Sequence, residues 1–268
     1  MRIFVHMKRL TPEQKAEMIE LYTSGQIKVP KKLDEKYNIF PGSCYNLLKR
    51  RGLIKYSIAD QLRCFNENYF DKIESEKQAY FLGLIAADGT VSSSKNTISI
   101  TLKVEDGLYL LEELKKEISS TGKISIYNDK RDNYVRKPMC MMQFTSMHTK
   151  TVFCELGISP NKTSNLCYPK INKELDRHFI RGFIDGDGSF HYKRGILVFA
   201  LVGTEEILRS IQDIFYTEIN VEYTKLIQHI TGVYYLRLGH KNTLKLREWL
   251  YKDCSVAMKR KQNYNDRL

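Results

Sequence analysis

The sequence lacks the residue groupings that mark several common classes of protein. Its six cysteines are widely spaced, with no CxxC pair and no pair of histidines nearby, so they indicate reduced thiols and not zinc ligands. No run approaches the roughly 20 apolar residues that span a bilayer, and the apolar part of the N-terminal MRIFVHMKRL is too short for a signal peptide. We therefore expect an intracellular protein, working in the cytoplasm of a bacterial or phage-infected cell or in an organelle matrix.

Acidic residues are also in deficit. The chain has 31 Asp and Glu against 43 Lys and Arg, which gives a formal net charge of +12, and basic residues occur in every segment. This excess favours a polyanionic partner, nucleic acid above all, although a soluble protein with solvated lysines is the alternative that charge alone leaves open. With 268 residues, 42% of them hydrophobic, the chain is long enough for two or three modest domains.

The first 55 residues carry the signals of three short helices. Thr11 to Gln14 forms a capping box with proline at the first helical position, so a helix begins there and ends before Gly25. Two more helices are expected to begin at Pro30 and Ser43, separated by the turn sequence NIFPG.

A tight turn before a basic third helix predicts a helix-turn-helix DNA-binding module over residues 1–55. Its residues expected to face a DNA groove are Tyr45, Asn46 and Lys49. A small helical bundle with a basic face is the alternative, because this motif is short and degenerate. Residues 56–78 are polar and charged, and we expect them to form a partly helical linker.

The most informative feature is an internal duplication. Residues 81–89 read FLGLIAADG and residues 180–188 read IRGFIDGDG, and their last aspartates, Asp88 and Asp187, lie 99 residues apart. The same offset relates Lys162 to Lys261. Such self-similarity indicates one structural unit present twice. We expect the copies to span residues 79–170 and 171–268.

Each copy is predicted to run helix, two strands, helix, two strands, helix, which is an α+β unit. Alternation of polar and apolar residues is typical of strands in a sheet with one covered face. In the first copy it marks strands at 97–103 and 123–127 and leaves a helix at 105–118; the matching segments of the second copy are strands at 195–201, 221–229 and 233–238 and a helix at 205–215.

The spacing of small residues in the motifs predicts two closely packed helices. Gly83 and Ala87 lie four residues apart on one helix face, and Gly182 and Gly186 repeat this spacing. Packing of these faces brings Asp88 and Asp187 together at the C-terminal helix ends, where the helix dipole and mutual repulsion disfavour negative charge. A divalent cation is the simplest compensation, and carboxylates with backbone carbonyls and water suit Mg²⁺.

Paired metal-binding carboxylates on a basic sheet surface are typical of a phosphodiester hydrolase. A lysine in register with each aspartate, Lys162 and Lys261, is expected to stabilise transition-state charge or polarise the attacking water.

The two motifs and their lysines resemble the LAGLIDADG homing endonucleases, in the monomeric form that carries both motifs in one chain, over about residues 79–268. The resemblance implies two pseudo-symmetric αββαββα units that form a saddle on a long specific site in double-stranded DNA and cut both strands across the minor groove. It also implies metal binding by Asp88 and Asp187, with the carbonyls of Ala87 and Gly186 as lesser candidates. Lys162 and Lys261 match the family's active-site lysines, with Lys259 as a competitor for the second position.

Several expectations depend on the resemblance alone. Asp106 and Glu205, which open the middle helices, would join a water network at the site. The first Asp of the pattern is Ala86 in copy one, against Asp185 in copy two, and we expect this change to weaken local hydrogen bonding without abolishing cleavage. Basic strand residues are the pool for DNA contacts, among them Lys103, Arg131, Lys193, Arg194 and Arg237.

The activity implied by the resemblance has alternatives. A lone DG dipeptide is more often a turn than a metal site, although two copies in register with lysines favour a site. The fold also serves DNA-binding regulators and intron RNA-splicing maturases that do not cut DNA. The presence of both aspartates and both lysines favours a Mg²⁺-dependent DNA endonuclease acting as a monomer.

Overall fold

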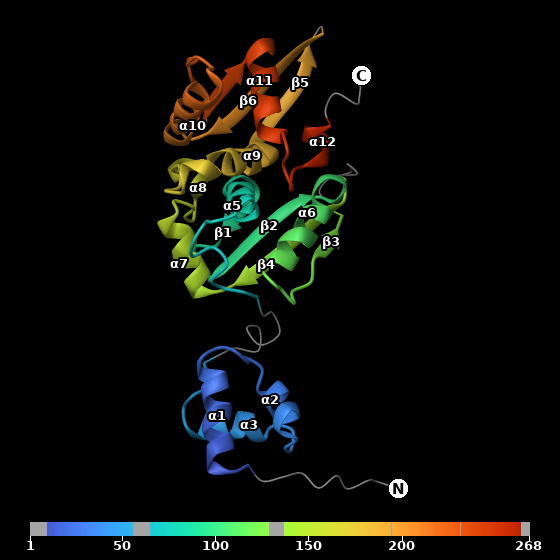
Figure 1. The fold of residues 1–268 in the computed structure, drawn as a ribbon, viewed down its shortest axis with the longest axis vertical. Coiled ribbons are helices and arrows are strands. Elements are labelled where there is room, and N and C mark those ends of the chain that lie inside the picture. The colour runs from blue at the N-terminus through green and yellow to red at the C-terminus, as the bar shows by residue number, and fades with distance from the viewer. Residues whose placement is uncertain (1–9, 56–64, 129–136, 194, 231, 264–268) are drawn as a thin grey trace. The chain divides into compact units, whose positions relative to one another are not determined.

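A computed structural model of the protein describes residues 10–55, 65–128, 137–193, 195–230 and 232–263. The chain divides into two compact units, Met1–Cys64 and Phe65–Leu268. Figure 1 labels elements of both units where there is room. Within the described ranges, no helix is long and apolar enough to cross a membrane.

The smaller unit contains the three expected helices, α1 (Pro12–Thr23), α2 (Pro30–Tyr37) and α3 (Ser43–Arg50). The capping box predicted at the start of α1 is present, since the Thr11 side chain accepts from the Gln14 N–H and the Gln14 side chain accepts from the Thr11 N–H. A small core closes the unit and is made of Met18, Tyr22, Leu33, Ile39, Cys44 and Leu48.

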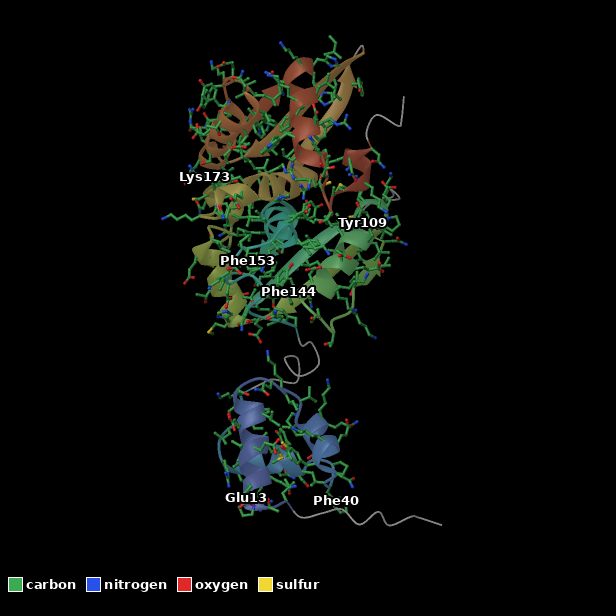
Figure 2. The ribbon with its side chains drawn as sticks, viewed as in Figure 1. Glu13, Phe40, Tyr109, Phe144, Phe153 and Lys173 are labelled. Carbon is green, nitrogen blue, oxygen red and sulfur yellow. The ribbon has the colours of Figure 1, made fainter. Side chains whose placement is uncertain are left out.

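A buried carboxylate fixes the turn between α2 and α3. Asp34 accepts hydrogen bonds from the N–H of Gly42 at 2.7 Å and from that of Cys44 at 2.8 Å. These bonds satisfy two backbone donors at the start of α3. Gly42 has φ +86°, a conformation that favours glycine. Phe40, labelled in Figure 2, is exposed in this turn.

The larger unit holds two four-stranded antiparallel sheets, one from each copy of the duplication (Figure 1). The first copy consists of α5 (Glu76–Asp88), β1 (Gly89–Val91), β2 (Thr97–Lys103), α6 (Val104–Glu117), β3 (Ser125–Tyr127), β4 (Met139–Thr145), α7 (Met147–Glu155) and α8 (Lys162–Asn165). The second consists of η1 (Lys173–Leu175), α9 (Asp176–Asp187), β5 (Gly188–Lys193), β6 (Ile196–Gly203), α10 (Glu205–Ile219), β7 (Ile227–Gln228), β8 (Tyr234–Leu238), α11 (His240–Tyr251) and α12 (Lys259–Gln262).

Both sheets have the same strand order and one covered face. The orders are β1-β2-β4-β3 and β5-β6-β8-β7. Alternate residues of β2, β4 and β6 are buried, and α6 contacts β2 and β4 while α10 and α11 contact β6. The other residues of these strands are at least partly exposed, so each sheet keeps an open face. The predicted pair of αββαββα units is confirmed.

The two motif helices, α5 and α9, form the seam between the copies. A methyl group on Gly83 would overlap the carbonyl oxygen of Phe179, and one on Gly182 would overlap that of Tyr80. The backbones of α5 and α9 therefore approach more closely than a side chain at either glycine would allow, as the small-residue spacing predicts. This seam fixes where the two helices end.

The copies differ from a uniform 99-residue repeat in their middle. The buried positions of α6 (Asp106, Gly107, Leu110, Leu111 and Leu114) match those of α10 (Ile207, Leu208, Ile211, Gln212 and Phe215) at an offset of 101. The β5–β6 hairpin pairs Gly188 with Leu201, whereas β1–β2 pairs Gly89 with Ile100, so it is the second hairpin that is longer.

The larger unit also begins earlier than the first copy was expected to begin. Phe70 is buried in the main core, and the N–H of Asn66 donates to the carbonyl of Ile118 at 2.7 Å. Helix α5 starts at Glu76, capped by Ser75. Residues 65–78, which we expected within the linker, therefore pack with the first copy.

Candidate active site

The two motif aspartates end their helices as predicted. Asp88 is the last residue of α5 and Asp187 is the last residue of α9. A glycine follows each of them, because a methyl group at Gly89 or Gly188 would overlap the last turn of the preceding helix. The chain can thus turn from each helix directly into a strand.

The carboxyl group of Asp88 lies against the facing helix. A Cβ on Gly186 would be 3.0 Å from Oδ2 of Asp88 and would overlap the side chain of Ala87. Glycine at position 186 therefore creates the space that the Asp88 carboxyl fills. Asp88 is half-buried, and Asp187 is the more exposed of the two.

Both carboxyl groups have raised pKa values. Burial and, to a smaller extent, the charge of Asp187 raise the pKa of Asp88 to about 6, against the opposing charges of Lys261 and Lys162. Desolvation at the crowded helix ends also raises the pKa of Asp187, against the charges of the same lysines. Two desolvated, mutually repelling carboxylates favour a bound cation.

Lys261 caps the end of α9 from a buried position. Its ammonium donates to the carbonyls of Ile184 at 2.7 Å, Asp185 at 2.6 Å and Gly188 at 2.6 Å, with Gly186 at 3.3 Å. Burial lowers the pKa of Lys261 to about 8, although Asp185 and both motif aspartates oppose the shift. Because these carbonyls use its three protons, Lys261 acts on the carboxylates through its charge.

Lys162 caps α5 in the same way but is only half-buried. Its ammonium donates to the carbonyls of Ala86 at 2.5 Å and Ala87. Desolvation lowers the pKa of Lys162, and the two motif aspartates oppose this. Lys259, the competitor in the sequence, lies elsewhere: its ammonium is 5.0 Å from the centre of the Tyr109 ring, which Figure 2 labels.

The residues present fit a hydrated Mg²⁺. Among the described residues, no group of three or more His, Cys, Asp or Glu could hold a metal ion. The site instead offers two carboxylates, and the nearby carbonyls of Ala87 and Gly186 already accept hydrogen bonds from lysines. Mg²⁺ commonly keeps several waters and takes one or two protein carboxylates together with phosphate oxygens.

Comparison with solved structures identifies this architecture. The homing endonuclease I-WcaI, bound to its DNA recognition sequence, superposes with a TM-score of 0.53 over 80% of this chain and 97% of that chain, at 12% identity. The chain has a LAGLIDADG fold. The N-terminal LAGLIDADG domain of WhiA also matches, with a TM-score of 0.47, 16% identity and coverage of 80% and 96%.

Comparison with known sequences identifies no family for the chain. No profile of a known protein family matches the chain. The uncharacterized protein MJ0314 of Methanocaldococcus jannaschii is 25% identical over 160 residues, which are 56% of this chain and 57% of that protein. The matched region thus spans little more than half the length of this relative.

Two residues expected near the LAGLIDADG site are not equivalent. Asp106 is buried and accepts from Arg260 at 2.8 Å, whereas Glu205 accepts from Arg209 in its own helix. With the 101-residue offset between α6 and α10, the residue of the second copy that is equivalent to Asp106 is Ile207. The pairing of Asp106 with Glu205 was therefore wrong, because the longer second hairpin moves the register.

The predicted DNA-binding residues divide between the two units. Lys103 is exposed at the end of β2, and Arg237 is exposed on β8 with its guanidinium 5.7 Å from the centre of the Tyr235 ring. Lys193 ends β5, while Arg131 and Arg194 lie outside the described residues. In the smaller unit α3 exposes Tyr45, Asn46 and Lys49. Their contact with DNA stays a prediction.

Sequence reasoning missed a polar cluster beside the LAGLIDADG seam. Asp185 is fully buried and accepts from the Tyr80 hydroxyl at 2.8 Å, the Tyr251 hydroxyl at 2.7 Å and the Met258 N–H at 2.6 Å. Arg181 is also fully buried, one turn earlier on α9. The signal available in the sequence was an Arg and an Asp inside an otherwise apolar motif.

Proposed function

We propose that the protein is a site-specific endonuclease that hydrolyses both strands of double-stranded DNA with a divalent cation, Mg²⁺ being the best fit. One observation carries the proposal: two carboxylates, Asp88 and Asp187, end closely packed helices, each of which is capped by a lysine ammonium. Neither packing nor stability requires two acidic side chains with raised pKa values at this position.

In this proposal the chain's residues bind and orient the reacting groups. Asp88 and Asp187 hold the cation beside the phosphate, and Lys162 and Lys261 lower the negative potential that two carboxylates and two helix ends create there. The cation, when bound, activates water and neutralises charge on the phosphate. Because both motifs are in one chain, one copy of the protein suffices to cut both strands.

The open faces of the two sheets are the proposed DNA surface. A net charge of +12 favours a polyanion, and Lys103 and Arg237 are exposed on strands of these faces. I-WcaI, whose fold this chain shares, is bound to its DNA recognition sequence. We propose that the strands contact a long duplex site and that cleavage occurs across its minor groove.

The smaller unit is proposed to extend this contact. Helix α3 presents Tyr45, Asn46 and Lys49 to solvent beside the basic residues Arg50 and Arg51. A second DNA-binding element in the same chain raises the effective concentration of the first at its target.

A cleavage screen tests the proposal. Randomised duplexes are incubated with the protein and Mg²⁺, and new double-strand ends are sequenced. We expect ends at one sequence class with the wild type and none with Asp187→Asn, which should still retain DNA in a filter-binding assay. Glu112→Gln, an exposed charge removal on α6, is the matched control and should cut normally.

The outcomes separate the candidate functions. DNA binding without cleavage under any divalent cation, and unaffected by Asp187→Asn, would favour a DNA-binding regulator. Selective retention of structured RNA instead of duplex DNA would favour a splicing maturase. Either result contradicts the endonuclease proposal.

A further inference from the structure

The connection from α11 to α12, the helix that carries Lys261, ends in a segment of five residues, Cys254–Met258, and polar side chains hold this segment. We refer to it as the C-terminal strap. Arg181 Nε donates to the carbonyl of Val256 at 2.9 Å, and Glu76 Oε1 accepts the N–H of Ser255 at 2.8 Å. The Nη2 of Arg181 also donates to Glu76 Oε1 at 2.6 Å. The strap is thus joined to both motif helices.

Asp185 completes the attachment at the end nearest Lys261. Its Oδ2 accepts the N–H of Met258 at 2.6 Å, and the carbonyl of Met258 accepts the N–H of Lys261 at 2.9 Å. The hydroxyls of Tyr80 and Tyr251 donate to the same carboxylate, so three donors compensate a fully buried charge. One carboxylate therefore fixes the residue from which α12 begins.

No such polar groups stand at the equivalent positions around the connection of the first copy. At the positions that match Glu76, Tyr80, Arg181 and Asp185 in the repeat stand Leu175, Phe179, Leu82 and Ala86. Its own connection to the active-site lysine is shorter, with six residues between Glu155 and Lys162 against nine between Tyr251 and Lys261. The buried side chain of Ile158 anchors that shorter connection.

We propose that Asp185 is a positioning residue, which together with Arg181 and Glu76 fixes Lys261 through the C-terminal strap. This support affects the cleavage of only one of the two DNA strands. The inference rests on the proposed endonuclease function. Lys162 depends on apolar packing around Ile158, whereas Lys261 depends on a buried hydrogen-bonded cluster. Damage to one support leaves the other lysine in place, so the two phosphodiester cleavages respond separately.

Strand-resolved cleavage tests this proposal. A target duplex found in the screen carries a different fluorophore on each strand, and single-turnover rates are measured for both strands with the full-length protein. For Asp185→Ala we expect one strand to slow by about tenfold or more relative to the other, since misplacement by about 1 Å can cost that much. Ile158→Ala should slow the opposite strand. Asp185→Asn, which keeps an acceptor oxygen, should restore part of the rate.

Thr243→Val is the matched control, because it removes a buried hydroxyl from α11 whose hydrogen bonds go to the carbonyls of Leu238 and Gly239 and not to the strap. Thr243→Val should leave the ratio of the two strand-cleavage rates unchanged, while its stability is similar to that of Asp185→Ala. Equal slowing of both strands by Asp185→Ala, or slowing of the same strand by Asp185→Ala and Ile158→Ala, overturns the proposal.

Hydrogen exchange separates this inference from the endonuclease proposal. Amides of residues 254–261 should exchange faster in Asp185→Ala than in the wild type, while those of residues 156–163 should not change. If the wild type cuts no DNA, the proposed function fails, and the exchange data still decide whether Asp185 holds the strap. Unchanged exchange at 254–261 refutes the positioning role whether or not DNA is cut.

Discussion

Replacing Asp88 with asparagine should abolish cleavage and yet stabilise the metal-free protein. The rise in the pKa of Asp88 from 3.8 to about 6 means that its ionised form is disfavoured in the folded state. At about 1.4 kcal/mol per pH unit this corresponds to about 3 kcal/mol, which partial exposure and screening reduce to about 1–2 kcal/mol. Asparagine has nearly the same shape and carries no charge.

The sign of the pH dependence follows from the direction of the shift. Because the folded pKa lies above the unfolded value, ionisation of Asp88 costs folding free energy, and this cost is absent below pH 3.8 and complete above pH 6. The stability advantage of Asp88→Asn should therefore be near zero at pH 4, grow between pH 4 and 6, and level off above pH 6.

Urea denaturation in EDTA between pH 4 and 8 measures this difference. Adding Mg²⁺ should then stabilise the wild type more than the variant, because the cation binds a carboxylate that only the wild type has. Glu112→Gln should follow the wild type throughout. A variant less stable than the wild type at pH 7.5, or a difference that does not change with pH, would refute the reasoning.

Three further variants test other consequences of the structure. Gly182→Ala places a methyl group on the Tyr80 carbonyl oxygen and must separate α5 from α9, so we expect a loss of about 3 kcal/mol or more in urea denaturation, together with loss of cleavage. Asp34→Ala leaves two N–H donors at the start of α3 unserved and should cost the smaller unit about 2 kcal/mol, measured by its own thermal transition. The triple change of Tyr45, Asn46 and Lys49 to alanine should shorten the DNA footprint and weaken binding while Mg²⁺-dependent cutting continues; an unchanged footprint contradicts the proposed role of α3.

Much of the fold was predictable because its signals are local or repeated. The capping box at Thr11, the alternation in residues 97–103 and the two glycine-spaced motifs each predict an element from a few neighbouring residues. The repeat then supplies the pairing of α5 with α9, and with it the positions of Asp88 and Asp187 at one end of the seam. The lysines follow because each lies at the same distance along the chain from its aspartate.

The remainder depends on contacts between residues far apart in the chain. The strand expected over 221–229 is reduced to Ile227–Gln228, because only these residues pair with β8. The two-residue difference between the hairpins is set by strand register. Because of this difference, the residue equivalent to Asp106 in the second copy is Ile207 and not Glu205. The cluster around Asp185 joins residues separated by 66 to 105 positions, so no window of sequence contains it.

The same cluster explains the departure of the first motif from its pattern. We expected Ala86, which stands where the second motif has Asp185, to weaken local hydrogen bonding. Ala86 is fully buried, and the position matching Tyr80 is Phe179, which has no hydroxyl to donate. A carboxylate at 86 would thus lack the phenol that Tyr80 gives to Asp185, and burial of a poorly compensated charge costs several kcal/mol. Alanine is the compatible residue there, and the first copy supports Lys162 by packing where the second supports Lys261 by hydrogen bonds.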